Sequence, residues 1–172
     1  MNERPYKING WYVIVHPLFT RQIEELTNEV EKLKASHPDT YQKKKVTLRL
    51  AAIKHLILND ITIDPSNTKF RLGGTLGDDY KHWFRAKFYQ QYRLFFRYES
   101  ASKIIILVWV NDDNTLRIYK AKNDAYKVFK GMLDDGNPPD DWGKLLSVCK
   151  TAQMNDNLEK HSAMKTKIIK VC

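Results

Sequence analysis

The sequence predicts an α+β fold: one strand, two helices, an antiparallel sheet and short helices at the end. Helical spacing in the first third and period-two alternation between residues 83 and 119 are the observations behind this prediction. The chain has 172 residues, 42% of them hydrophobic, enough for one domain with a real core and too few for two ordinary ones. We expect one domain over residues 1–150 and a loosely attached tail over residues 151–172.

The N-terminal third is predicted to begin with a strand and a helix. Residues 9–15 are largely apolar, and His16-Pro17 ends the run, as expected of a strand. Over residues 18–33 the apolar side chains keep helical spacing, while glutamates line the other side. The helix is expected to end at the Ser-His-Pro-Asp sequence of residues 36–39.

A second helix is predicted over residues 41–58, with Asp39 or Thr40 as its N-cap. Its apolar positions recur at helical spacing, and its outer side is basic. Two helices in succession form a hairpin that can cover one face of a sheet. After a connection, residues 70–76 are predicted to form a short strand.

The stretch from residue 83 to residue 119 is predicted to form an antiparallel meander. Apolar and polar residues alternate over residues 84–88 and 92–98, so that one side of each strand faces the core. Residues 104–110 are apolar throughout, as expected of a central strand covered on both faces. Alternation returns over residues 116–119, the predicted last strand.

Cations and aromatic rings share the side of the meander that faces away from the predicted core. They are Trp83, Arg85, Lys87, Arg93, Arg97, Arg117 and Tyr119. The net charge of the chain is +9, and residues 68–130 hold 13 Lys and Arg against 6 Asp and Glu. Such a concentration of positive charge is typical of a surface that binds a polyanion. This face of the meander therefore predicts an RNA-binding surface.

Two short helices are predicted to close the domain. The apolar spacing of residues 124–133 indicates the first, which Asp135-Gly136 would end. Asn137-Pro138-Pro139 leads into the second, expected over residues 140–148.

Several function classes lack support in the sequence. Cys149 and Cys172 are the only cysteines, too few for a disulfide framework. The longest apolar run is far too short to span a bilayer, and we expect a cytoplasmic protein. No nucleophile-elbow motif occurs, and the glycines of residues 73–77 lack the spacing of a phosphate loop.

Asp112 and Asp113 are the residues with which a metal-dependent nuclease could hold its ions. The Asn-Asp-Asp-Asn sequence of residues 111–114 is also typical of a turn between strands, and no other acidic cluster completes a metal site. We expect them to be turn residues, and we expect no cofactor. Among the five histidines, His82 is the candidate for proton transfer because it directly precedes the basic face.

Four groups of residues form long and uncommon motifs. They are Asn9-Gly10-Trp11 with His16-Pro17, the block from Tyr92 to Tyr98, the run from Trp109 to Tyr119, and Pro138-Pro139-x-Asp141-Trp142. Together they closely resemble YhaV-type toxins of the RelE-like superfamily, over about residues 8–145.

The resemblance implies a RelE-like fold and the toxin of a bacterial type II toxin–antitoxin system. It implies an endoribonuclease that cuts mRNA in association with translating ribosomes, without a metal and with the 2′-hydroxyl of the RNA as nucleophile. The implied partner is a PrlF-type antitoxin with an AbrB-like DNA-binding domain. The pair would repress its own operon, and operator DNA would be bound only through that complex.

Such an enzyme must activate the 2′-hydroxyl, neutralise a pentacoordinate phosphorane and protonate the leaving 5′-oxygen. Arginine suits the second task, because its fork grips two phosphate oxygens and its charge does not titrate away. The candidate catalytic residues are Arg85 first, then Arg93, Arg97 and Arg117 as supporting clamps, and Tyr119 or His82 for proton transfer.

Four further residues are predicted to bind RNA. Lys87 and Lys81 add positive charge, and Lys87 can also lower the pKa of a neighbouring group. Trp83 and Phe95 are expected to stack on bases. Two alternatives stay open: a noncatalytic RNA- or ribosome-binding module, and a surface that docks only an acidic protein.

Overall fold

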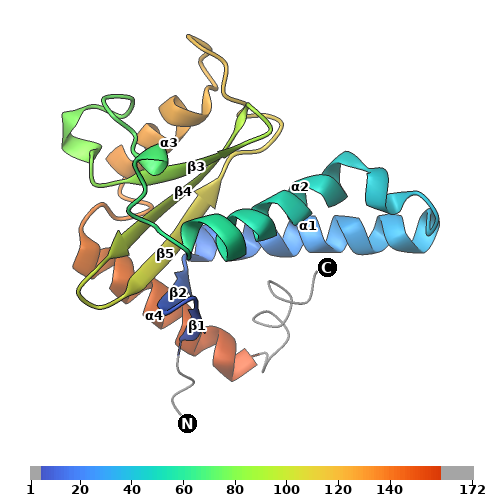
Figure 1. Cartoon of the computed structure of the whole chain (residues 1–172), viewed down its shortest axis with the longest axis horizontal. Coiled ribbons are helices and arrows are strands. Elements are labelled where there is room, and N and C mark those ends of the chain that lie inside the picture. Colours follow the sequence, from blue (N-terminus) through green and yellow to red (C-terminus); the bar gives the residue numbers. More distant parts are fainter. Residues whose placement is uncertain (1–4, 160–172) are drawn as a thin grey trace.

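A computed structural model, which describes residues 5–159, places a five-stranded mixed sheet between helices (Figure 1). The elements are β1 (Tyr6–Ile8), β2 (Trp11–Val15), α1 (Pro17–Ser36), α2 (Lys45–His55), β3 (Phe84–Phe88), β4 (Tyr92–Glu99), β5 (Ile104–Val110), α3 (Ala125–Asp134) and α4 (Trp142–Glu159). None of the helices within the described range is long and apolar enough to cross a membrane.

The strands lie in the order β1-β2-β5-β4-β3, with β5 in the middle. The β3–β4 and β4–β5 pairs are antiparallel, which confirms the first three strands of the predicted meander. The β2–β5 pair is parallel, so the sheet is mixed and not antiparallel throughout. Because β1 and β2 lie beyond β5, the long apolar strand has a neighbour on each side, as its sequence predicted.

The predicted first strand is in fact a hairpin. β1 pairs antiparallel with β2, and Asn9 and Gly10 form the two-residue turn between them. Their φ angles of 49° and 86° are the left-handed values that a tight hairpin turn requires, which asparagine and glycine tolerate best. The strand predicted over residues 9–15 therefore begins too early and misses its partner.

Two other predicted strands are wrong. Thr68–Phe70 is a 3₁₀ turn, and only Arg71, which bridges to Phe84, has strand-like pairing within residues 70–76. Residues 116–119 are irregular, because the backbone N–H of Ile118 donates to the Asp124 carboxylate instead of to a strand. Apolar residues of both segments, such as Leu72 and Leu116, pack against the core without joining a ladder.

The first two helices lie side by side and extend beyond the sheet (Figure 1). α1 begins after His16, whose Nδ1 accepts a hydrogen bond from the Leu18 backbone N–H at 3.1 Å. The second predicted helix is three pieces: a 3₁₀ turn at Tyr41–Lys43, then α2, then a π-helical turn at Leu56–Ile61. The predicted cap at residues 39–40 is wrong, because neither the 3₁₀ turn nor α2 has a side-chain N-cap bond.

Each face of the sheet has its own core. The face packed against α1 and α2 buries the alternating residues that the sequence assigned to the interior; from β3 and β4 these are Ala86, Phe88, Tyr92, Leu94 and Phe96. The opposite face packs against α3 and α4 and buries Trp83, Phe95, Ile106, Val108 and Trp109. The predicted parity is therefore correct, but the basic face of the sheet is covered by helices.

α3 and α4 differ in how well their limits were predicted. Asp124 caps α3 by accepting from the Tyr126 backbone N–H at 3.1 Å, and α3 ends at Asp134 with Asp135 as its C-cap before Gly136, as predicted. α4 begins two residues later than predicted and continues without a break past residue 150, the expected start of the tail. Residues 160–172 of that tail lie outside the described residues.

Candidate functional site

Tyr126, near the start of α3, is the point at which two arginines of the sheet converge. Arg85 on β3 donates its Nε–H to the Tyr126 hydroxyl at 2.9 Å, and Arg93 on β4 donates its Nε–H to the same oxygen at 3.0 Å. All three residues are at least 90% buried. Two guanidiniums that would otherwise repel each other are thus held on one phenol.

A third arginine reaches the same ring. The Arg117 guanidinium lies over the Tyr126 ring, with its Cζ 4.9 Å from the ring centroid. Arg117 also forms an ion pair with the buried Asp124 carboxylate at 2.6 Å. Because Asp124 caps α3 as well, one carboxylate fixes both the helix and the arginine.

The register of the sheet explains why these side chains meet. Arg85 lies opposite Phe95, and Lys87 lies opposite Arg93, so the cations of β3 and β4 point to the same face. The Phe95 ring packs edge-on against Tyr126, with the centroids 5.7 Å apart, and stacks on Phe129 of α3 at 4.1 Å. Aromatic packing therefore sets the distance between α3 and the sheet. At this distance the Tyr126 hydroxyl reaches the arginines.

The cluster carries more positive than negative charge. It contains three guanidiniums, those of Arg85, Arg93 and Arg117, and one carboxylate, that of Asp124, which pairs with Arg117. Cations removed from water are costly unless anions or hydrogen-bond acceptors compensate them. Backbone carbonyls compensate part of this charge: Arg85 donates to the Lys69 carbonyl, and Arg93 donates to the Gln90 and Tyr92 carbonyls. An anionic ligand would supply the rest.

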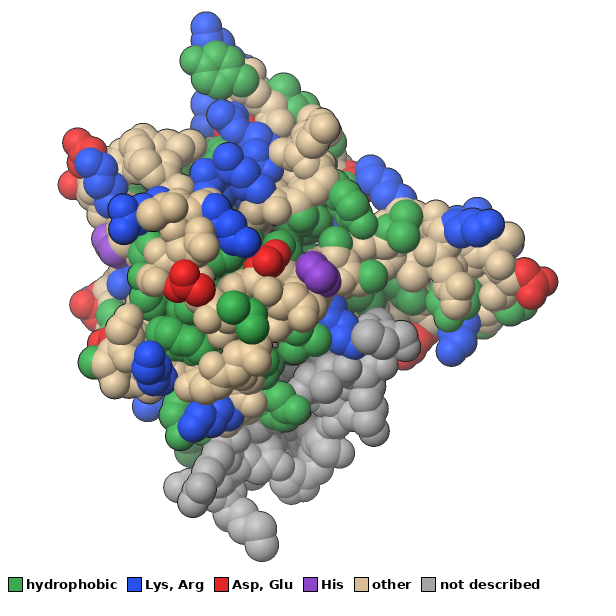
Figure 2. Space-filling view, viewed as in Figure 1, with side chains coloured by type: hydrophobic (Ala, Val, Ile, Leu, Met, Phe, Trp, Pro, Cys, Tyr) green, Lys and Arg blue, Asp and Glu red, His purple; other side chains and the backbone are tan. Residues whose placement is uncertain are grey.

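Parts of both guanidiniums remain open to a ligand. Nη2 of Arg85 and Nη2 of Arg93 form no hydrogen bond with any residue of the described chain. Neither atom is fully buried. Figure 2 shows Lys and Arg side chains gathered over the region where α3 and β3 lie in Figure 1. A phosphate can therefore approach this end of the sheet through positively charged surroundings.

Tyr119 and Lys87 lie at the rim of this cluster. Tyr119 is 77% exposed, and the guanidinium of Arg117 lies 5.8 Å from the centroid of its ring. Lys87 is exposed on β3 across from Arg93. The structure thus brings together five of the predicted site residues: Arg85, Lys87, Arg93, Arg117 and Tyr119.

Arg97 and His82 belong to a separate group around Asp140. The Arg97 guanidinium lies between the indoles of Trp83 and Trp142, at 5.2 Å and 5.5 Å, and donates to the Asp140 carbonyl at 2.7 Å. His82 Nε2 lies 2.6 Å from an Asp140 carboxylate oxygen, which also accepts from the Trp83 indole. Burial lowers the pKa of the Arg97 guanidinium, and the nearby carboxylates of Asp140 and Asp141 partly oppose this. These contacts fasten the α3–α4 connection to the sheet.

Two predicted base-stacking residues are not available for that role. Trp83 and Phe95 are fully buried, each in contact with the Phe129 ring, so neither has a free face for a base. Sequence parity placed them on the basic face correctly, but it did not reveal that α3 covers this face. Lys81, the other predicted RNA contact, is exposed and forms an ion pair with Asp78 at 2.6 Å.

Sequence reasoning missed Tyr126 and Asp124. Tyr126 has the spacing of an apolar helix position, which its buried ring satisfies, and nothing local marks its hydroxyl as functional. Asp124 stands directly before a helical run, a pattern that indicates an N-cap but not an ion pair with Arg117. Only the pairing of β3 with β4 and the packing of α3 bring these residues to the arginines.

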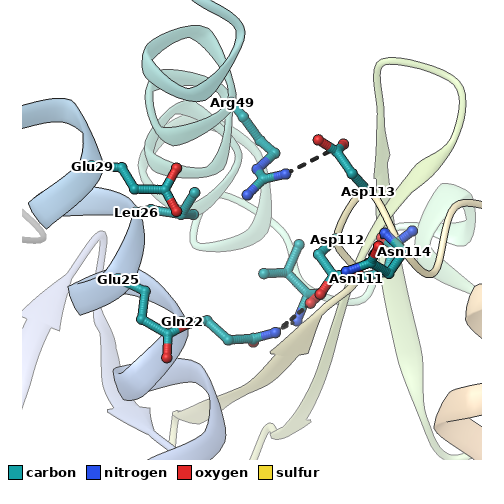
Figure 3. Close-up of a pocket in the computed structure, with 10 residues that line it drawn as sticks. Gln22, Glu25, Leu26, Glu29, Arg49, Asn111, Asp112, Asp113 and Asn114 are labelled. Atoms are coloured by element: carbon teal, nitrogen blue, oxygen red, sulfur yellow. Dashed lines mark hydrogen bonds and ion pairs between the residues drawn. The ribbon is translucent and has the colours of Figure 1, made fainter. Parts of the chain in front are cut away.

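A pocket of about 260 Å³ lies at the C-terminal end of β5, the end at which Arg93 also lies, but between α1, α2 and the turn at residues 111–114 (Figure 3). Arg49 points into it and forms an ion pair with Asp113 at 3.5 Å. A hydrogen bond from Tyr92, with help from Lys45 and Arg49, holds the pKa of Asp113 below its ordinary value. Arg49, the cation of this pocket, is thus already paired with Asp113. The pocket is therefore a poor site for a polyanion.

In this turn, Asp112 and Asp113 make the contacts of turn residues. Asp112 accepts from the Asn114 backbone N–H at 2.9 Å and from the Thr115 hydroxyl at 2.9 Å, as a turn residue does. Asp113 is occupied by Lys45 and Arg49. Among the described residues, no three His, Cys, Asp or Glu side chains gather as metal ligands.

The sequence matches a known family of toxins. A family model described as a toxin with endonuclease activity, of a toxin–antitoxin system, matches residues 13–150. Toxin YhaV of Escherichia coli O6:H1 and ribonuclease toxin YhaV of Escherichia coli K12 are each 48% identical to the chain over 143 residues, which is 82% of this chain and 93% of theirs. No solved structure matches significantly. With most of its length matched, this chain belongs to the YhaV family of toxins, which have endonuclease activity and act within toxin–antitoxin systems.

Proposed function

We propose that this protein is a toxin that cleaves mRNA at the arginine cluster around Tyr126, without a metal and with the 2′-hydroxyl of the RNA as nucleophile. The observation that carries the proposal is the excess of guanidiniums over carboxylates at Tyr126. RNA as the substrate is supported by the name of the relative from Escherichia coli K12, ribonuclease toxin YhaV. A RelE-like fold is supported by the resemblance of the sequence motifs.

The arginines suit the charge that develops during cleavage. When the 2′-oxygen attacks, the phosphorane carries more negative charge than the phosphodiester, and preorganised cations lower the energy of that state most. Arg85 and Arg93 are held by Tyr126 and by backbone carbonyls, so little reorganisation is needed before they bind phosphate. Arg117, which is less buried, contacts the substrate from the rim.

Four further elements of the proposal rest on the family resemblance. The protein cuts mRNA on translating ribosomes. It is neutralised by a PrlF-type antitoxin with an AbrB-like DNA-binding domain. The pair binds operator DNA through the antitoxin and represses its own operon. All of this takes place in the cytoplasm.

The ends of the RNA products test the chemistry. Purified protein is incubated with a long mRNA in EDTA, and in parallel with ribosome-bound mRNA in a magnesium buffer. A 2′-hydroxyl nucleophile leaves a 2′,3′-cyclic phosphate and a 5′-hydroxyl, whereas metal-activated water that displaces the 3′-oxygen leaves a 5′-phosphate and a free 2′,3′-diol.

Cyclic phosphate ends formed in EDTA would support the proposal. Cleavage that requires added metal and leaves 5′-phosphate ends would overturn it. Binding of RNA without any cut, with or without ribosomes, would favour a noncatalytic RNA-binding module. Arg21→Ala replaces an exposed arginine on α1. It is the matched control for the variants that remove an arginine of the cluster.

A further inference from the structure

The hydroxyl of Tyr126 receives two hydrogen bonds that can run in only one direction. A guanidinium nitrogen always donates and never accepts, so the Tyr126 oxygen is the acceptor toward both Arg85 Nε and Arg93 Nε. Two N–H donors occupy the acceptor positions of the phenol oxygen. The hydroxyl proton must therefore point in a third direction, away from both arginines.

No side chain or carbonyl within residues 5–155 takes that proton. The two bonds from Arg85 and Arg93 are the hydrogen bonds that the Tyr126 hydroxyl forms there. The proton is thus free for a ligand that binds to the arginines. A phosphodiester held by the open Nη2 atoms would bring one of its oxygens toward this donor.

Three guanidiniums contact the side chain of Tyr126. Two N–H groups of cations point at the oxygen, and the Arg117 guanidinium lies 4.9 Å from the ring centroid. The nearest carboxylate of the cluster, that of Asp124, is already paired with Arg117.

We infer that Tyr126 is the general acid of the cleavage reaction, which donates its proton to the leaving 5′-oxygen. This inference rests on the proposed function, because it assigns one step of that reaction. As the 2′-oxygen bonds to phosphorus, its proton passes to solvent water. The bond from phosphorus to the 5′-oxygen then breaks, and that oxygen keeps the electron pair and takes the Tyr126 proton.

The products are a 2′,3′-cyclic phosphate and a 5′-hydroxyl. The Tyr126 phenolate, held by Arg85 and Arg93, regains a proton from water. General acid catalysis of this kind contributes about 10²- to 10⁴-fold to a rate. Tyr119 and His82, the residues predicted for proton transfer, lack this arrangement: Tyr119 is exposed at the rim, and His82 is bound to Asp140.

A purely structural role for Tyr126 makes a different prediction. If the phenol only orients Arg85 and Arg93, then its loss disturbs phosphate binding whatever the leaving group is. A leaving group that needs no proton separates the two roles. Replacing the bridging 5′-oxygen at the cleavage site with sulfur does this, because a thiolate is a stable anion.

Single-turnover rates are measured for wild type, Tyr126→Phe and Arg85→Ala on two RNAs that differ only in this bridging atom, at a site mapped beforehand. Tyr126→Phe keeps the ring packing against Phe95 and Phe129. We expect it to slow cleavage of the oxygen RNA by about 10²- to 10⁴-fold and to cleave the sulfur RNA within about tenfold of wild type. Arg85→Ala should slow both RNAs, because neutralising the phosphorane does not depend on the leaving group.

Equal losses on both RNAs in Tyr126→Phe would overturn the general-acid role and leave the proposed function intact. Full activity of Tyr126→Phe on both RNAs would also overturn it. Intact RNA with the wild-type protein would overturn the proposed function and the inference with it. Should Tyr126→Phe melt well below wild type, 3-fluorotyrosine at position 126 replaces it, and the pH profile should then shift on the oxygen RNA alone.

Discussion

Arg85 joins the three parts of the molecule that build the site. Its guanidinium contacts the Tyr126 hydroxyl of α3 and the Lys69 carbonyl of the preceding loop, while its backbone belongs to β3. A charge fixed at this point contributes to cleavage only if it stabilises the transition state more than the bound RNA.

We predict that Arg85→Ala reduces the rate of RNA cleavage by a factor of hundreds, which corresponds to about 3 to 4 kcal/mol. Cleavage assays and thermal melting of the same preparation check this. Arg21→Ala should keep wild-type activity. Toxicity and cleavage of Arg85→Ala equal to wild type would remove Arg85 from the site.

Phe96 lies on the opposite face of the same strand pair and should affect only stability. It is fully buried in the core beneath α1 and α2, with the Phe70 ring 5.4 Å away. Phe96→Ala should lower the free energy of unfolding by about 3 to 5 kcal/mol, measured by chemical denaturation. Tyr89→Ala, which truncates an aromatic ring that is 57% exposed, should lower it by less than about 1 kcal/mol. A Phe96→Ala protein as stable as wild type would mean that this face is not the core.

At the scale of the elements, the start of α1 should respond to pH. Burial lowers the pKa of His16 to about 4, and its Nδ1 accepts from the Leu18 N–H, so the folded state holds the neutral ring. The unfolded chain binds a proton below about pH 6.5, and the folded chain does so only near pH 4. The stability that His16 contributes is therefore complete above pH 6.5 and is lost as the pH falls toward 4.

His16→Asn tests this effect, because asparagine keeps an acceptor for the Leu18 N–H but does not titrate. Between pH 7 and pH 4.5, wild type should lose about 2 to 3 kcal/mol more stability than His16→Asn. Denaturant titrations at a series of pH values give both curves. Parallel curves would show that the buried ring is not the cause of acid sensitivity.

The sequence revealed most of the strands and little of what covers them. Alternation in β3 and β4 and the apolar run of β5 follow from packing against two cores, so their patterns predicted them correctly. Residues 70–76 and 116–119 carry apolar residues for tertiary contacts and not for a ladder, which is why they resembled strands.

The sequence likewise predicted some residues of the candidate site and missed others. Parity placed Arg85 and Arg93 on one face, because a strand alternates regardless of its neighbours. Parity did not separate Arg97 from them, because Arg97 has the same parity. Its guanidinium nevertheless lies among the indoles around Asp140. Tyr126 stayed hidden because its ring obeys the apolar spacing of α3 and only its oxygen enters the cluster.

For the whole molecule, the net charge of +9 should make RNA binding depend on salt. Lys87 is exposed beside the cluster, whereas Lys81 is paired with Asp78. We predict that Lys87→Ala weakens RNA binding and reduces the slope of log affinity against log salt by about 0.7, the value for one single-strand phosphate contact. Lys81→Ala should leave the slope nearly unchanged. A larger loss from Lys81→Ala would place the RNA path along the other end of the sheet.

Arg93 and Arg97 provide the most direct test of where the chemistry occurs. Both lie on β4 and on the same face, but Arg93 contacts Tyr126 and Arg97 contacts the Asp140 carbonyl. The measurement is the single-turnover rate of RNA cleavage by Arg93→Ala and Arg97→Ala, at saturating protein and at a temperature where both are folded. If the cluster at Tyr126 is the active site, then Arg93→Ala is slower than wild type by a factor of about hundreds and Arg97→Ala remains within about tenfold. A rate for Arg93→Ala close to wild type, together with a large loss in Arg97→Ala, would contradict this and place the active site at Asp140.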